Sequence, residues 1–427
     1  MIFIASPVFS QMEEKEWSLI FIVNGSNSLV DEAIKDLKSI ASVGSSDQVN
    51  ILVHFAKSVK SKGFMNWTGL KTFYVKKNDK YDAKEAIDSD VVSQIKSKES
   101  INRLISELKI KFPARKYMTI FWDHANILNR PPVSPQPPFA DPTYRNELLL
   151  KFEYYKAILG MDENVMDFEE FTRVLPKVPD NSRFTPILSF LDNTTFVVSD
   201  LKTLNNNTSD ILLFDACLLA NLEMAKILKG RTEYMIASQE VIKASKSHRY
   251  DDLLYRLIKN PLQSPSEFAN LIMSQFRKNN KHRALSLIVP ENISPILNEL
   301  EEFSIAIIQA INKKSISIGD IGLIRNKCSS LGEELSDKKT IDFIDFLKKF
   351  KRGTSDRALK NKAKHLLRLF RNNEIVKINH PPHYSKNLNG ISIYYPDFSE
   401  KEVDEEYVKI TPTKSWNELL IKIETFN

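Results

Sequence analysis

The stretch that decides the fold is Ile211-Leu212-Leu213-Phe214-Asp215-Ala216-Cys217, followed directly by Leu218-Leu219-Ala220-Asn221-Leu222-Glu223-Met224-Ala225. The short apolar run predicts a buried strand, and the apolar residues after it have helical spacing. Cys217 therefore stands at the carboxyl end of a strand, where open α/β sheets bind their ligands. We expect its thiol to be partly exposed and its thiolate to be favoured by the N-terminus of the next helix. The alternative is a buried cysteine that packs as a small apolar residue.

A second apolar run, residues 117–122, predicts another strand, and it ends in Asp123-His124-Ala125. A histidine at the end of one strand and a cysteine at the end of another can face each other above the same sheet edge. A Cys/His dyad needs this arrangement, in which the thiol attacks and the imidazole handles its proton. Of the seven histidines, only His124 directly follows a long apolar strand, whereas His54 lies inside a strand and is expected in the core.

These segments resemble the clostripain family of cysteine peptidases, which belongs to the same structural clan as caspases, gingipains and legumain. Residues 121–124 resemble the family's histidine strand, and residues 214–218 resemble its nucleophile motif. Other segments match the family in the same order along the chain, namely 17–24, 27–29, 49–55, 234–240, 285–288, 341–343, 390–396 and 413–416. Several weak motifs in the correct order make a stronger signal than any one of them.

The resemblance implies an α/β fold, a caspase-like sandwich whose mostly parallel central sheet is flanked by helices, with a helical C-terminal elaboration. It implies a cysteine endopeptidase in which Cys217 attacks the peptide bond and His124 protonates the leaving amine. The backbone N–H groups of Ala125 and Cys217 would form the oxyanion hole. Ala125 stands where the family has Gly, but an alanine keeps the N–H donor. The main alternative is a catalytically inactive caspase-like module for binding or assembly, although the chain retains both dyad residues.

The resemblance also implies cleavage after Arg or Lys. It assigns substrate binding to Asp215, at the floor of the primary pocket, and to Ser238, Gln239 and Glu240. A structural alternative for Asp215 is a cap on the following helix turn. The segment 241–249 contains several cations, which would repel a basic substrate side chain if they faced the pocket.

The chain is expected to divide into four parts. Residues 1–16 form a signal-peptide remnant or a leader, because residues 1–10 carry no charge. Residues 17–251 form the caspase-like catalytic core, with a proline-rich and helical insertion at about 130–190. Residues 252–380 form a helical elaboration, and residues 381–427 supply a strand and a helix that return to the core. Within the insertion, Lys177 and Arg183 flank an irregular stretch that would suit either self-processing or a passive surface loop.

Composition narrows the function further. The 427 residues include 60 Lys and Arg against 54 Asp and Glu, and the basic clusters suit solvated helix faces better than a nucleic-acid groove. Two cysteines 111 positions apart make no disulfide framework, and Cys328 has no partner motif. The sequence contains no run of 18 apolar residues, so no membrane span is expected. We expect protein or peptide substrates, with export slightly favoured over a cytoplasmic location, and the oligomeric state is open.

One rival motif follows the first predicted strand, where residues 24–28 read Asn-Gly-Ser-Asn-Ser. This motif resembles the D-x-S-x-S metal site of von Willebrand A domains, but Asn24 replaces the charged ligand. Gly25 stands alone without a dinucleotide-binding motif, and no G-x-S-x-G supports a serine hydrolase. No metal or other cofactor is expected. Calcium is associated with some enzymes of this kind, but no Asp-rich loop argues for a calcium site here.

Overall fold

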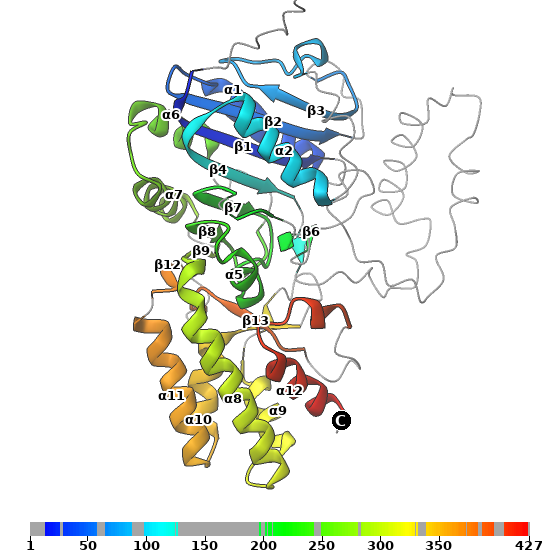
Figure 1. Cartoon of the computed structure of the whole chain (residues 1–427), viewed down its shortest axis with the longest axis vertical. Coiled ribbons are helices and arrows are strands. Elements are labelled where there is room, and N and C mark those ends of the chain that lie inside the picture. The colour runs from blue at the N-terminus through cyan, green and yellow to red at the C-terminus, as the bar shows by residue number, and fades with distance from the viewer. Residues whose placement is uncertain are drawn as a thin grey trace, which may run out of the picture.

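The chain folds around one large sheet, as the computed structural model shows (Figure 1). The structure describes residues 13–25, 29–57, 65–87, 98–123, 125–126, 196–197, 201–202, 204–206, 208–242, 249–280, 283–328, 330–331, 339–372, 374–382, 387–396 and 405–425. His124, the start of the expected leader, and the insertion expected at about 130–190 with Lys177 and Arg183 lie outside these residues.

The central sheet has eight strands in the order β12-β9-β8-β7-β4-β1-β2-β3. Their bounds are β1 Lys15–Gly25, β2 Val49–Lys57, β3 Gly69–Tyr74, β4 Ala114–Trp122, β7 Ile211–Asp215, β8 Tyr234–Ala237, β9 Leu285–Ile288 and β12 Val376–His380. The five inner strands from β8 to β2 are parallel, and antiparallel strands close both edges. The expected mostly parallel sheet is confirmed.

Helices cover both faces of this sheet, and the strand β1 shows why. Its side chains alternate between two separate apolar clusters, with Trp17 and Leu19 on one side and Ile20 and Ile22 on the other. The helices α1 (Val30–Val43), α6 (Tyr250–Lys259) and α7 (Pro265–Asn279) cover the first face, and α2 (Lys98–Lys111) and α5 (Leu222–Leu228) cover the second. Burial on both faces explains the near-continuous apolar runs of the parallel strands.

The C-terminal region continues this core beyond the β12 edge. Its helices are α8 (Ser294–Asn312), α9 (Ile318–Asn326), α10 (Phe343–Gly353), α11 (Arg357–Asn372) and α12 (Lys414–Glu424), which fill the lower half of Figure 1. A small antiparallel sheet of β10 (Ser330–Leu331), β11 (Thr340–Asp342) and β13 (Ser392–Tyr394) lies between them and the central sheet. Edge-on contacts of Trp416 with Phe343, Phe346 and Tyr395 form the centre of this region.

The structure adds detail to the expected parts of the chain. Residues 381–427 contain the strand β13, which pairs in the small sheet, and β9 and β12 belong to the central sheet although they lie in the stretch 252–380 that was expected to be helical. β6 (Phe196–Val197) pairs with β5 (Ala125–Asn126) in a separate two-stranded sheet. A short 3-10 helix, Ala83–Glu85, precedes α2 in the chain.

No helix within the described residues is long and apolar enough to cross a membrane.

Candidate active site

The two strands predicted to carry the dyad are neighbours in the sheet. β4 and β7 run parallel, and Trp122 at the end of β4 pairs with Asp215 at the end of β7. Cys217 lies two residues beyond Asp215, and in the sequence His124 lies two residues beyond Trp122. His124 itself is outside the described residues, so the dyad stays a prediction. The register brings the two chain segments to the same edge of the sheet.

The next strand along, β1, contributes to this edge through Asn24. Its amide Nδ2 donates a hydrogen bond of 2.9 Å to Oδ2 of Asp123, and both side chains are buried. Asn24 is the residue that replaces the charged ligand in the rival metal motif, and here its amide acts as a donor. Within the described residues no group of three or more His, Cys, Asp or Glu side chains is arranged to hold a metal ion.

Cys217 is buried, with 7% of its surface exposed, because a second loop covers its thiol. The Ile242 N–H donates to Sγ at 3.3 Å, and the Ile242 carbonyl lies 3.7 Å from Sγ as an acceptor for the S–H. A small apolar cluster surrounds these groups and comes from segments far apart in the sequence: Leu218, Ile242, Ala284, Leu331 and Leu388. The expectation of a partly exposed thiol is wrong for this state of the protein.

Burial raises the pKa of Cys217 from 9.0 to about 11. The hydrogen bond from Ile242 opposes this rise, and the negative charges of Asp215, Glu240 and Asp123 add to it. The thiol is therefore protonated at neutral pH. A thiolate at this position requires either exposure of the sulfur or a nearby positive charge.

The loop that carries Cys217 also differs from the expected helix start. α5 begins only at Leu222 and is capped by Asn221, whose Oδ1 accepts from the Met224 N–H at 2.7 Å. The intervening loop contains Leu218 in a left-handed conformation, φ +60°, and its N–H bonds to the Glu240 carbonyl at 3.3 Å. The N-terminus of α5 is thus too far along the chain to stabilise a Cys217 thiolate, and the expectation that it would do so is wrong.

Asp215 lies just below Cys217 and accepts a hydrogen bond of 2.8 Å from the Tyr250 hydroxyl at the start of α6. Because Asn221 caps α5, Asp215 is not its N-cap. A second carboxyl group is close enough to interact with Asp215. Burial, with the charge of Asp215, raises the pKa of Asp36 on α1 to about 7, and its hydrogen bond from the Trp122 indole opposes this.

Asp36 and Tyr250 are site residues that the sequence did not reveal. They reach Asp215 from helices that are far apart along the chain, and neither belongs to a motif. A cation is also near: burial lowers the pKa of Arg283, and the negative charge of Asp215 opposes this shift. Asp215 therefore has one other carboxyl group, one phenol and one guanidinium near it.

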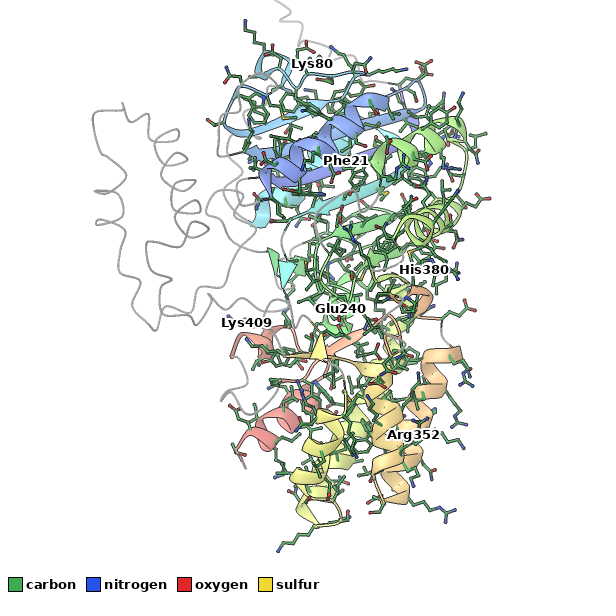
Figure 2. The ribbon with its side chains drawn as sticks, turned by 180° about the vertical axis from the view of Figure 1, so that it is seen from behind. Phe21, Lys80, Glu240, Arg352, His380 and Lys409 are labelled. Atoms are coloured by element: carbon green, nitrogen blue, oxygen red, sulfur yellow. The ribbon has the colours of Figure 1, made fainter. Side chains whose placement is uncertain are left out.

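The predicted substrate-binding residues after β8 take part in internal contacts. Ser238 Oγ bonds to both the N–H and the carbonyl of Glu240, at 3.0 and 2.9 Å. Gln239 is fully buried, and its amide donates to Asp342 Oδ2 at 3.0 Å and accepts from the Gly390 N–H. Glu240 is partly exposed near the junction between the sheet and the C-terminal helices (Figure 2). Ala125, the predicted oxyanion donor, opens β5 and is buried.

Comparison with known proteins identifies the family. A sequence model of the clostripain family matches residues 188–417, which is more than half of the chain. The chain belongs to the clostripain family. The matched region contains Cys217, Asp215 and Gln239, whereas His124 precedes it. Members of this family are cysteine peptidases, so the chain is a cysteine-type peptidase that acts on protein or peptide substrates. No curated protein sequence matches the chain.

Solved structures show the same fold over nearly the whole length. An inactive zymogen of a C11 protease from Parabacteroides distasonis has a TM-score of 0.59 and 14% sequence identity, covering 94% of this chain and 98% of that one. A secreted C11 cysteine protease from Bacteroides thetaiotaomicron, in complex with an irreversible peptide inhibitor, has a TM-score of 0.56 and 15% identity, covering 94% and 99%. The fold is the caspase-like sandwich of the family.

Proposed function

We propose that this member of the clostripain family is an endopeptidase that cleaves after Arg or Lys through a dyad of Cys217 and His124. The observation that carries this proposal is the register of β4 and β7. Trp122 and Asp215 are cross-strand partners, so the two chain segments that follow them leave the sheet side by side at one edge. His124 and Cys217 each lie two residues along these segments. The negative charge of Asp123, the residue next to His124, acts on the Cys217 thiol, which supports their proximity.

In this mechanism Sγ of Cys217 attacks the carbonyl carbon of the scissile bond, and its proton passes to the imidazole of His124. His124 then protonates the leaving amine, which departs and leaves a thioester on Cys217. A water molecule, deprotonated by His124, attacks the thioester and releases the acid product and the thiol. The N–H groups of Ala125 and Cys217 would hold the oxyanion, and the loss of one such donor costs about 10²–10³ in rate.

A preference for basic residues is supported by the charge around Asp215. Asp36 adds a second carboxyl group near Asp215, and a buried carboxylate binds a guanidinium or ammonium strongly. Arg283 opposes this charge from inside the protein. The preference therefore depends on whether the cation of a substrate side chain reaches Asp215 and competes there with Arg283.

The decisive experiment for the dyad is a positional-scanning library of fluorogenic peptides, assayed on wild-type protein, Cys217→Ala and His124→Ala. Both variants should lose activity while their melting temperatures stay at the wild-type value. Cys328→Ala is the matched control, because Cys328 is also buried and its Sγ donates a hydrogen bond of 3.5 Å to the Ile324 carbonyl of the preceding helix, α9. Activity that survives in Cys217→Ala but not in Cys328→Ala would refute the assignment, and an inactive wild type would favour a binding module.

The pocket assignment needs a separate test. Asp215→Ala should lower kcat/KM on Arg and Lys peptides about 10- to 100-fold, because a hydrogen bond between charged groups contributes about 1.5–3 kcal/mol. The control is Tyr250→Phe, which removes the hydrogen bond to Asp215 but leaves its charge. If Asp215→Ala and Tyr250→Phe lower activity equally, Asp215 acts through the packing of α6 and not on the substrate.

We further propose that the protein acts outside the cytoplasm. The charge-free residues 1–10 support export, and the structurally similar protease from Bacteroides thetaiotaomicron is a secreted one. Fractionation of cells that express the full chain tests this. Retention of all of the protein in the cytoplasmic fraction would contradict it.

A further inference from the structure

The positive charge of this protein is concentrated in one helical hairpin. Residues 343–372, which form α10 and α11, contain ten Lys and Arg against two Asp, a net charge of +8. The whole chain has a net charge of +6, so the rest of the protein is slightly acidic. The two helices pack against each other, and this hairpin lies at the end of the molecule opposite β3 (Figure 1).

Within the hairpin, half of these cations lie on a single face of α11. They recur at spacings of three and four residues, which places them on one side of a helix, and all are exposed: Arg357, Lys360, Lys364, Arg368 and Arg371. We call this set the cationic stripe. The opposite face of α11 is buried in the core through Leu359, Ala363, Leu366 and Phe370. The amphipathic helix thus fixes the stripe towards solvent.

Carboxylates of the described residues do not neutralise the stripe. Lys362 and His365, which lie beside it, pair with Glu299 on α8 at 3.6 and 3.0 Å. No residue of the stripe forms such a pair within the part of the chain that the structure describes. Asp356, just before α11, is occupied in capping it, since its Oδ1 accepts from the Ala358 and Leu359 N–H groups at 2.9 and 3.1 Å.

The shape of the stripe distinguishes between anionic partners. Arg357 to Arg371 spans 14 residues of helix, roughly 21 Å at 1.5 Å per residue. The stripe lies on the outer side of a helix at the edge of the molecule, and it contains no aromatic side chain on which a base could stack. A straight row of flexible cations on a protruding helix fits a flat anionic surface better than it fits a groove-bound polymer.

We propose that the cationic stripe of α11 binds the protein peripherally to membranes that contain anionic lipids. The apolar side of α11 is already buried in the core, so the attachment is electrostatic and does not insert into the bilayer. Each Lys or Arg that lies close to an anionic membrane surface strengthens binding to it about fivefold. In Figure 1, β5 and β6 beside the strand ends lie on the other side of the molecule from α11, so a protein attached through α11 keeps this edge uncovered.

The experiment is sedimentation of the full chain with vesicles of phosphatidylcholine, with and without phosphatidylglycerol. The wild type should bind only the anionic vesicles, and high salt should release it. The triple variant Lys360→Gln, Lys364→Gln, Arg368→Gln should lower the partition coefficient about 100-fold. A matched control removes Lys80, which Figure 2 shows at the other end of the molecule, together with two exposed cations close to it in the sequence, in the triple variant Lys77→Gln, Lys80→Gln, Lys84→Gln, and it should bind as the wild type does.

A second variant separates charge from geometry. Arg368→Lys with Arg371→Lys keeps the charge and should retain binding, since a lipid surface needs no bidentate guanidinium. Equal binding of wild type to neutral and anionic vesicles would overturn the proposal, as would an equal loss in the control triple variant. Binding to a DNA duplex that depends on the stripe, with no binding to vesicles, would overturn the lipid assignment as well.

Discussion

The buried thiol of Cys217 leads to a prediction that can be worked through in numbers. In the substrate-free protein the pKa of Cys217 is about 11, against 9.0 for an ordinary thiol. At about pH 8 an ordinary thiol is a thiolate in about one molecule in ten, and this thiol in about one in a thousand. Because the thiolate is the nucleophile, Cys217 should react with iodoacetamide about 100-fold more slowly than an exposed cysteine.

Ile242 is the residue to change, because it covers the sulfur with its side chain and contacts it through both backbone groups. Ile242→Ala removes the apolar cover but keeps the backbone N–H. We expect the alkylation rate of Cys217 at about pH 8 to rise about tenfold, a pKa shift of about one unit, since other residues of the cluster still cover the thiol. Mass spectrometry of the labelled peptide measures the rate in a Cys328→Ala background, so that only one thiol reports.

The matched control is Ile316→Ala, the same truncation at a residue of similar exposure in the core of the C-terminal region. It should leave the rate unchanged. The reasoning is refuted if the wild-type thiol reacts as fast as free cysteine with an inflection near pH 7. It is also refuted if Ile242→Ala and Ile316→Ala accelerate labelling equally, because truncation of any core residue would then expose the thiol by loosening the fold.

Three further predictions concern buried ionisable groups away from the thiol. The pKa of Asp36 is about 7, so the stability contributed by its protonated form is present below about pH 4 and is lost as the pH rises to about 7. Asp36→Asn should therefore raise the free energy of unfolding in urea at about pH 8 by about 2 kcal/mol, after allowance for the partial exposure of this side chain. The control variant, Asp31→Asn at an exposed position of the same helix, should leave the free energy of unfolding unchanged. Burial lowers the pKa of His54 to about 3, so the stability contributed by its neutral form is complete above about pH 6.5 and is lost as the pH falls to about 3. His54→Gln should therefore make the free energy of unfolding fall less steeply with pH between about 6.5 and 3. An unchanged pH dependence in this variant would show that His54 is not the cause. Asp342→Ala should lower the free energy of unfolding by about 3–5 kcal/mol, because it leaves several buried donors without an acceptor; a loss below about 1 kcal/mol would contradict this.

The parts of the fold that the sequence predicts well are those in which one short segment contains the whole signal. β1, β4 and β7 are buried over most of their length, so each contains a mainly apolar run that local pattern identifies. β12 could not be recognised in this way. It is an edge strand of five residues, all at least partly exposed, and its partner β9 lies about 90 residues earlier in the chain.

The candidate site divides in the same way. Cys217 follows directly from its strand, and its neighbour Asp215 comes with it. Ile242, Tyr250 and Asp36 reach the site only because loops and helices distant in sequence fold over the strand ends. The burial of the thiol is therefore a property of tertiary packing. No pattern within the nucleophile segment distinguishes a covered cysteine from an exposed one.

The C-terminal region is a structural part of the site because it holds the Cys217 loop from one side. The Ser392 N–H of β13 donates to the Ala220 carbonyl at 2.9 Å, only three residues beyond Cys217. On the other side, the Gln239 amide joins the end of β8 to Asp342 of β11 and to Gly390. Since Ala220 N–H in turn donates to the Ser238 carbonyl, β8, the nucleophile loop and β13 form one hydrogen-bonded series. Movement of the small sheet therefore displaces the loop that carries Cys217, which gives a physical reason why motifs as distant as 341–343 and 390–396 accompany the nucleophile motif in this chain.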